Sequence, residues 1–271
     1  MNYREQPPSA ALAPYIRCFW AISDDVGGQA DFEPVLPDGC PEIVFNLADR
    51  IQRQHDDGSI ETQPETVFSG QLKRRILIRP SGVVSLFGVR FQPAGAAPFV
   101  GIPLTELFGS VISPHLISAS AFQDLDSRIR EAGSFVGCMA LFESAMLRIL
   151  ANGIDVDPIA EEACRIISQT SGAISVSRLA RRYGITERKL QRIFDRNIGI
   201  SPKRYSRIQR FQSFVREIEA AESPNILDIA LAAGYYDQPH LIREFRDIAG
   251  RSPLEYFKQT HRISELFTTA K

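Results

Sequence analysis

The chain has 271 residues, enough for two domains of ordinary size, and its 44% apolar content supports buried cores. No stretch approaches the roughly 18 uninterrupted apolar residues of a membrane helix, and no apolar run follows the charges near the N-terminus. We therefore expect a cytoplasmic protein with no membrane partner. The net charge of −1 conceals an uneven distribution along the chain.

The first half shows short runs rich in β-branched and aromatic residues, at 16–22, 42–47 and 83–91. Turn sequences such as Pro37-Asp38-Gly39 separate them, which predicts an antiparallel sheet or barrel. Some of their side chains are candidates for lining a small-molecule pocket, although core packing or an ordinary surface charge explains each of them at least as well. These candidates are Trp20, Phe45, Phe87 and Arg90.

One amphipathic helix follows these strands, with apolar residues from Cys138 to Leu150 at the spacing of a single helix face. Such a face must be covered. We expect it to pack on the sheet of its own chain, and the alternative is a face shared with a second subunit in a homodimer.

A boundary is expected near residues 151–157. Asn152 and Gly153 end one helix, and Asp157-Pro158 supplies a capping carboxylate followed by a proline in the first helical turn. We predict a β-rich domain at 1–152 and a helical domain at 157–262. The fold class is α+β, with an antiparallel barrel-like domain that carries helices, followed by an all-α domain.

Positive charge is concentrated in the second half. Residues 157–262 carry a net charge of +5, against −6 for the rest, and residues 178–210 alone have a net charge of +9. Charge blocks on helices are often only solvated faces. Because this block coincides with a repeated pattern, we interpret it as a phosphate-binding surface.

The repeated pattern consists of two similar segments about fifty residues apart. Leu179, Ala180 and Gly184 return as Ile229, Ala230 and Gly234, at an offset of 50. At an offset of 51, Leu190, Arg192, Phe194, Gly199, Ser201, Pro202 and Tyr205 return as Leu241, Arg243, Phe245, Gly250, Ser252, Pro253 and Tyr256. Two copies of a helix, a glycine turn and a second helix predict two helix-turn-helix units that grip duplex DNA at two places.

We expect seven helices in this half. They include one at 159–169, first-unit helices at about 175–183 and 186–197, a long helix at 202–220, second-unit helices at about 225–233 and 237–249, and a short helix from 252. At 1.5 Å per residue the long helix spans about 27 Å, comparable with the roughly 34 Å between successive major-groove faces of a duplex. Both units can therefore meet one side of the DNA.

The second helix of each unit presents its outer face to a major groove. Leu190 and Phe194 point inward, which leaves basic and amide side chains outside. Arginine pairs with guanine and glutamine with adenine, so these residue types suit base recognition. The candidate DNA contacts are Arg188, Lys189, Gln191 and Arg192 in the first unit, Lys203 and Arg204 on the long helix, and Gln238, His240 and Arg243 in the second unit.

The second unit is expected to contribute less binding energy. Pro239 removes a backbone donor at the start of its second helix, and we place Glu244 and Asp247 on the exposed face beside Arg243 and Arg246. For Arg243, an ion pair with one of these two acids is the alternative to a DNA contact.

Residues 175–256 resemble the DNA-binding domain of the AraC/XylS family of bacterial transcription regulators. The motifs are LARRYGITERKLQRIF, GISPKRY, ALAAGYYDQPHLIREF and GRSPLEY. The resemblance implies two helix-turn-helix units, joined by a long helix, that enter adjacent major grooves. It places Arg188, Gln191 and Arg192, and then Gln238, His240 and Arg243, where the two recognition helices of the family touch DNA. RNA polymerase is a further expected partner.

The first half, through VLPDGCPEIVFNL and LFGVRFQPAGAAPFVGIPLTEL, is similar to a sensor-like domain found in a subgroup of these regulators. Such domains commonly bind a small effector, dimerise, or both. We expect a DNA-binding regulator without catalytic activity that is modulated by a small effector. One alternative is a ligand-independent regulator whose first domain only mediates dimer or polymerase contacts.

The cysteines bear on a second alternative, a DNA-repair alkyltransferase that uses Cys40. No basic residue next to Cys40 in sequence favours a thiolate, and Glu42 opposes one. The four cysteines also lack the paired spacing of a zinc site or a disulfide framework, so we expect reduced thiols, no metal and no cofactor. They are Cys18, Cys40, Cys138 and Cys164.

Overall fold

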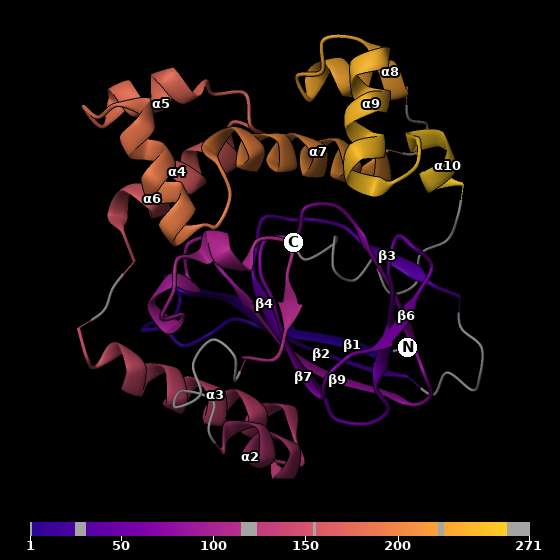
Figure 1. The fold of residues 1–271 in the computed structure, drawn as a ribbon, viewed down its shortest axis with the longest axis vertical. Coiled ribbons are helices and arrows are strands. Elements are labelled where there is room, and N and C mark those ends of the chain that lie inside the picture. Colours follow the sequence, from indigo (N-terminus) through magenta and orange to yellow (C-terminus); the bar gives the residue numbers. More distant parts are fainter. Residues whose placement is uncertain (1, 25–30, 115–123, 154–155, 222–224, 259–271) are drawn as a thin grey trace.

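The computed structural model describes residues 2–24, 31–114, 124–153, 156–221 and 225–258. In the first half, two antiparallel sheets face each other. The larger sheet comprises, in spatial order, β1 (Asn2–Gln6), β2 (Ile16–Asp24), β9 (Val84–Phe91), β4 (Glu42–Asn46), β7 (Thr66–Ser69) and β10 (Val111–Ile112). The smaller comprises β3 (Glu33–Val35), β8 (Ile76–Pro80), β5 (Ile51–Gln54) and β6 (Ile60–Thr62). The predicted strand runs and the antiparallel, barrel-like class are confirmed, although the two sheets do not close into a barrel (Figure 1).

The larger sheet is buried on both faces, and its side chains point alternately into two apolar clusters. Phe19, Phe45 and Phe87 point to one face, where Phe142 of helix α3 (Phe135–Leu150) lies 6.0 Å from the Phe19 ring and 6.3 Å from the Phe45 ring. Trp20 packs in the cluster on the other face, toward the smaller sheet. The apolar stripe of α3 therefore covers the sheet of its own chain, as predicted. Helix α2 (Leu125–Glu131) packs beside α3.

The second half contains seven helices within the described ranges, as predicted. They are α4 (Pro158–Gln169), α5 (Val176–Arg182), α6 (Glu187–Asn197), α7 (Pro202–Ala220), α8 (Ile226–Ala232), α9 (Gln238–Ala249) and α10 (Pro253–Phe257). Asp157 caps α4 and Thr186 caps α6 through backbone amides of their first turns. The turns inside the two units need Gly184 and Gly234, whose φ angles of +61° and +87° suit a residue without Cβ.

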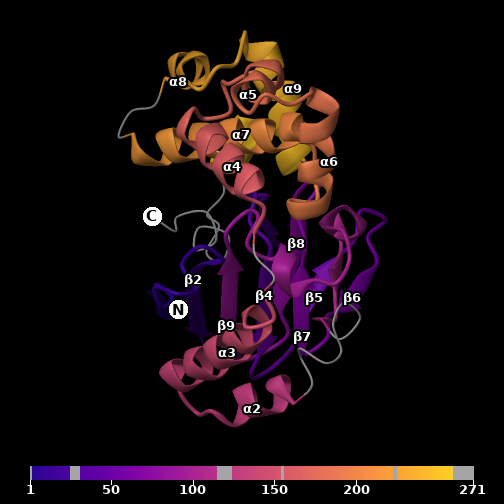
Figure 2. The same ribbon diagram turned by 90° about the vertical axis from the view of Figure 1, so that its left-hand side faces the viewer.

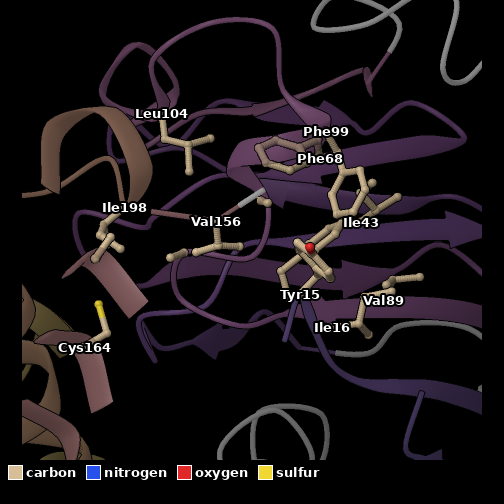
Figure 3. Packing of buried hydrophobic residues seen from close by; sticks show 14 of the residues in the cluster. Tyr15, Ile16, Ile43, Phe68, Val89, Phe99, Leu104, Val156, Cys164 and Ile198 are labelled. Atoms are coloured by element: carbon tan, nitrogen blue, oxygen red, sulfur yellow. The ribbon is translucent and has the colours of Figure 1, made fainter. Parts of the chain in front are cut away.

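The helical half lies as a layer across one end of the strands (Figure 2). It shares a core with the first half: Leu104 of the short helix η2 (Leu104–Leu107) and Val156 lie between the sheet residues and the side chains of Cys164 and Ile198 (Figure 3). A second cluster joins Leu36 of the first half to Phe211 and Phe245 of the helical half. Since apolar packing crosses the expected boundary, the division at residue 152 stays a prediction, and residues 259–262 lie outside the described ranges.

The described residues contain neither a membrane-spanning helix nor a cluster of metal-binding side chains. No helix there combines the length and the apolar character needed to cross a bilayer. Within the same ranges, no group of three His, Cys, Asp or Glu side chains is arranged to hold a metal ion.

Candidate nucleic-acid interface

The first unit consists of α5, the turn at Gly184 and the recognition helix α6. Leu190 and Phe194 are fully buried, and Arg188, Lys189 and Arg192 are exposed on the opposite face of α6. This is the orientation that the packing argument predicted, although contact of these side chains with DNA stays a prediction.

Gln191 is partly buried, and its Nε2 donates a hydrogen bond of 2.6 Å to Oδ1 of Asp195, one turn further along α6. A glutamine amide has two N–H donors and one carbonyl acceptor. One donor is engaged, so the second N–H and the carbonyl oxygen still match the N7 and N6 groups of an adenine.

The two basic residues predicted at the start of α7 lie in different environments. Lys203 is exposed, but Arg204 is half-buried against the first half of the chain. Its Nη2 donates to the carbonyl oxygen of Lys73 at 2.7 Å, and its guanidinium carbon lies 4.8 Å from the centre of the Phe108 ring. Arg204 therefore belongs to the contact between the halves rather than to the exposed basic surface, where the sequence had placed it.

The second unit consists of α8, the turn at Gly234 and the recognition helix α9. Gln238 and Arg243 are exposed, whereas His240 is partly buried. Its Nδ1 accepts a hydrogen bond of 3.3 Å from the backbone N–H of Tyr236, and its Nε2 lies 3.8 Å from Oε2 of Glu244. His240 is thus the least available of the three predicted contacts in this unit.

The exposed position predicted for Glu244 is wrong: its side chain is only 6% exposed. Nε of Arg207 on α7 donates to Glu244 Oε2 at 3.0 Å, and Nη2 of Arg207 donates to Oδ2 of Asp247 at 2.8 Å. Glu244 follows Leu241 by three residues and precedes Ile248 by four, so it lies on the inward face, and this spacing was a usable signal. Burial acts to lower the pKa of Arg207, but its bonds to Asp247 and Glu244 outweigh that effect and raise it.

This arrangement removes the proposed alternative role of Arg243. Glu244 and Asp247 are both engaged by Arg207, and within the described ranges no ion pair of Arg243 is found. The acids of α9 therefore fasten the second recognition helix to α7, and they leave Arg243 on the outer face.

Sequence reasoning missed the contacts that hold α7 against the first half. Gln212 Nε2 donates to the carbonyl oxygen of Pro37 at 2.7 Å, and Gln209 Nε2 donates to that of Asp38 at 3.1 Å. Gly39 follows Asp38 in the chain and faces the ring of Tyr205 on α7. The sequence did show two glutamines among the apolar positions of α7, which indicates buried amides that need partners. No nearby residue in the sequence identified those partners.

Both units also contact the first half directly. Gly199, just after α6, approaches Leu104 so closely that a Cβ there would lie 2.7 Å from the Leu104 carbonyl oxygen. At the end of α9, the carbonyl oxygen of Ile248 accepts a hydrogen bond of 2.8 Å from the backbone N–H of Arg75. The first half thus touches the first unit, the connecting helix and the second unit.

The structure does not bring the four pocket candidates together. Phe45 and Phe87 face α3, whereas Trp20 and Arg90 lie on the opposite face of the sheet. A cavity of about 70 Å³ between the two sheets is lined by Arg90 among others, and Phe87 lines a separate cavity of about 400 Å³.

Arg90 is 3% exposed, and its Nε donates to Oε1 of Glu42 at 2.6 Å and lies 3.5 Å from Oδ2 of Asp38. Burial acts to lower the pKa of Arg90, but the two carboxylates outweigh it and hold the pKa well above its ordinary value. The charge of Arg90 is therefore balanced within the protein.

The environment of Cys40 is, on balance, that of an unreactive thiol. The fold brings Nη1 of Arg17 to 3.9 Å from its sulfur, a basic neighbour that the local sequence did not show. Burial nevertheless raises the pKa of the thiol to about 12, with Asp38 acting in the same direction and Arg17 against it. This environment gives the alkyltransferase alternative no support.

Two family models match the chain. Residues 179–259 match a model described as a helix-turn-helix domain, and residues 4–113 match one described as a domain of unknown function, DUF6597. No curated protein sequence gives a significant match.

Solved structures with the same overall fold include ToxT from Vibrio cholerae. One ToxT structure is 9% identical to this chain, with a TM-score of 0.50. The alignment covers 93% of this chain and 99% of the ToxT chain. Another ToxT structure, bound to (E)-4-(8-methylnaphthalen-1-yl)but-3-enoic acid, is 10% identical, with a TM-score of 0.50. That alignment covers 89% of this chain and 98% of the ToxT chain. The AraC-like transcriptional activator CuxR is 12% identical with a TM-score of 0.28 and covers 81% and 87%.

The two units with exposed recognition helices, together with the match over 179–259, define a DNA-binding protein of the helix-turn-helix class. The two units are joined by a single 19-residue helix, α7. Over residues 179–259, the chain therefore carries a helix-turn-helix domain of the kind found in AraC-type transcription regulators.

Proposed function

We propose that this protein is a transcription regulator that binds specific duplex sequences through α6 and, more weakly, through α9. The supporting observation is the face of α6, where Arg188, Lys189 and Arg192 are all exposed opposite a fully buried apolar stripe. Arginines on such a face pair with guanine edges, and lysine adds a phosphate contact.

The two recognition helices are proposed to contribute unequally. On α9, Gln238 and Arg243 are exposed, but His240 is turned partly inward toward Glu244. Arg204 is excluded from the proposed interface, since it is held against Lys73 and Phe108, while Lys203 remains in it. Contacts with RNA polymerase and with a second copy of the chain stay predictions.

The test is selection of bound duplexes from a random library by the wild-type protein, followed by binding measurements on Arg192→Ala. This variant is expected to lose discrimination at one base position, by about 1–3 kcal/mol. Arg196→Ala is the matched control, since Arg196 is an exposed arginine in the last turn of the same helix.

Two outcomes would contradict the proposal. If the library yields no enriched sequence, the protein does not recognise bases. If both arginine variants weaken all duplexes to the same extent, α6 contributes only charge, which acts through counterion release and does not distinguish bases.

We further propose that a small effector, bound between the two sheets, modulates DNA binding. The support is the loop 36–40: Leu36, Pro37, Asp38 and Cys40 line the cavity between the sheets, and the carbonyls of Pro37 and Asp38 hold α7. At about 70 Å³ the cavity has room for only two or so water molecules, so an effector must part the walls and thereby displace this loop.

A thermal-shift screen of small metabolites against the full chain tests this proposal, since a ligand selective for the folded state raises the melting temperature. A true effector should also change the affinity for the selected duplex, and both effects should disappear in Val44→Trp, which fills the cavity. If no compound does both, the ligand-independent alternative is favoured, in which the first half only holds the two units in place.

A further inference from the structure

A third and larger cavity, of about 650 Å³, lies between the two helix-turn-helix units. It is lined by residues 172–175 and the first residue of α5, by one face of α7, and by His240 and Glu244 of α9. In Figure 1 the two units stand at opposite ends of α7, and elements of both contribute to its walls. A ligand here would therefore touch the two units at once.

The walls are rich in positive charge. Three cations of α7 line the cavity, namely Lys203, Arg207 and Arg210, against the single carboxylate of Glu244. Arg207 is paired with Glu244 and Asp247, and Nη1 of Arg210 lies 3.9 Å from Oε1 of Glu244. Because three cations face one carboxylate, the walls keep a net positive charge, which favours an anion.

Two polar groups of the walls have unused hydrogen-bonding capacity. Ser206 is 7% exposed, and within the described ranges its buried Oγ has no hydrogen-bond partner. The same holds for the buried Nε–H of Arg210. Buried polar atoms are nearly always paired, so two unpaired groups beside one cavity indicate a bound group with oxygen acceptors.

We propose that this cavity binds a backbone phosphate of duplex DNA, where a strand crosses from the groove occupied by α6 to the groove occupied by α9. This inference rests on the proposed function. Ser206 Oγ and Arg210 Nε are covered in the free protein, and they donate to the phosphate oxygens once their side chains turn toward the cavity, where Lys203 contributes charge. Such a contact carries no base information and fixes the position of the two units on the duplex.

The experiment measures binding of the selected duplex and of a random duplex as a function of salt. Ser206→Ala is expected to weaken both by about threefold to tenfold without lowering the stability of the free protein, because it deletes an unpaired hydroxyl. Arg210→Gln removes one phosphate neutralisation, so the salt slope falls by about 0.9 and the affinity drops about fivefold at 0.15 M salt. Arg216→Gln, an exposed α7 residue outside the cavity, serves as the control for loss of charge.

Unchanged affinity in Ser206→Ala overturns the inference, and that variant keeps it testable even if Arg210→Gln fails to fold. Inorganic phosphate is the second probe. If it raises the melting temperature of the wild type but not of Ser206→Ala, while duplex affinity is the same in both, the site serves a free anion and the duplex assignment is wrong. A wild type that binds no duplex contradicts the proposed function instead.

Discussion

The contact between loop 36–40 and α7 predicts an asymmetry between two glycine substitutions. Gly39 has a φ of +88°, and a Cβ there would lie 2.8 Å from Cε2 of Tyr205 and 2.9 Å from Nε2 of Gln209. Gly58 has nearly the same φ, +84°, but no atom within 4 Å of its hypothetical Cβ. Gly58→Ala is therefore a matched control that shares the backbone effect and lacks the steric one.

The magnitudes follow from this difference. A left-handed backbone costs an alanine about 1–2 kcal/mol at either position, and the change in the unfolded chain is the same for both. Overpacking against α7 adds about 1–3 kcal/mol at position 39 alone. Gly39→Ala is thus expected to lower the free energy of unfolding by about 1–3 kcal/mol more than Gly58→Ala does.

Urea denaturation of the full chain measures both values, with the m-value checked for constancy. Equal losses at the two positions would show that the loop does not press on α7 in solution. That result would also count against the proposed effector mechanism, in which displacement of loop 36–40 alters its contact with α7.

Three other predictions concern single side chains. Cys40 should resist alkylation at pH 8 in the folded protein and react after unfolding, since a thiol with its pKa raised to about 12 stays protonated; rapid labelling of the native protein would contradict this. Glu244→Gln should lower the free energy of unfolding in urea by about 1–3 kcal/mol, because it removes the buried negative charge that pairs with Arg207 of α7. Asp247→Asn should lower it by less than about 1 kcal/mol, because the Asp247 side chain is 57% exposed. Asp195→Ala frees Gln191 and removes a negative charge from α6, so gel-shift assays should show tighter duplex binding at low salt, and unchanged binding would argue that this face lies away from DNA.

The helical half was predictable because its signals are local. Capping residues, glycine turns and apolar spacing each act within a few residues, which is why the bounds predicted for the long helix, 202–220, coincide with those of α7. The strands were predictable individually, but their arrangement was not. β2 pairs with β9 and β9 with β4 across long sequence separations, and no local feature specifies these partners.

The two placements at the candidate site that the sequence did not reveal have the same origin. The sequence shows Arg204 in a basic run at the start of a helix, and only the fold shows that Lys73 and Phe108 lie over it. Glu244 was assigned to the surface on its charge, although its spacing from Leu241 placed it inside, where the distant Arg207 neutralises it. Long-range partners decided both cases.

Gln209 and Gln212 donate hydrogen bonds to the carbonyls of Asp38 and Pro37, and these bonds matter for the construction of chimeric proteins. Backbone carbonyls offer the same chemistry whatever the loop sequence, but their positions depend on Gly39 and its left-handed backbone. A first half grafted from another protein would need this turn, or a redesigned face of α7, to make the same contact with α7. An exchange at residue 152 alone would lose these two hydrogen bonds unless the new loop placed its carbonyls in the same way.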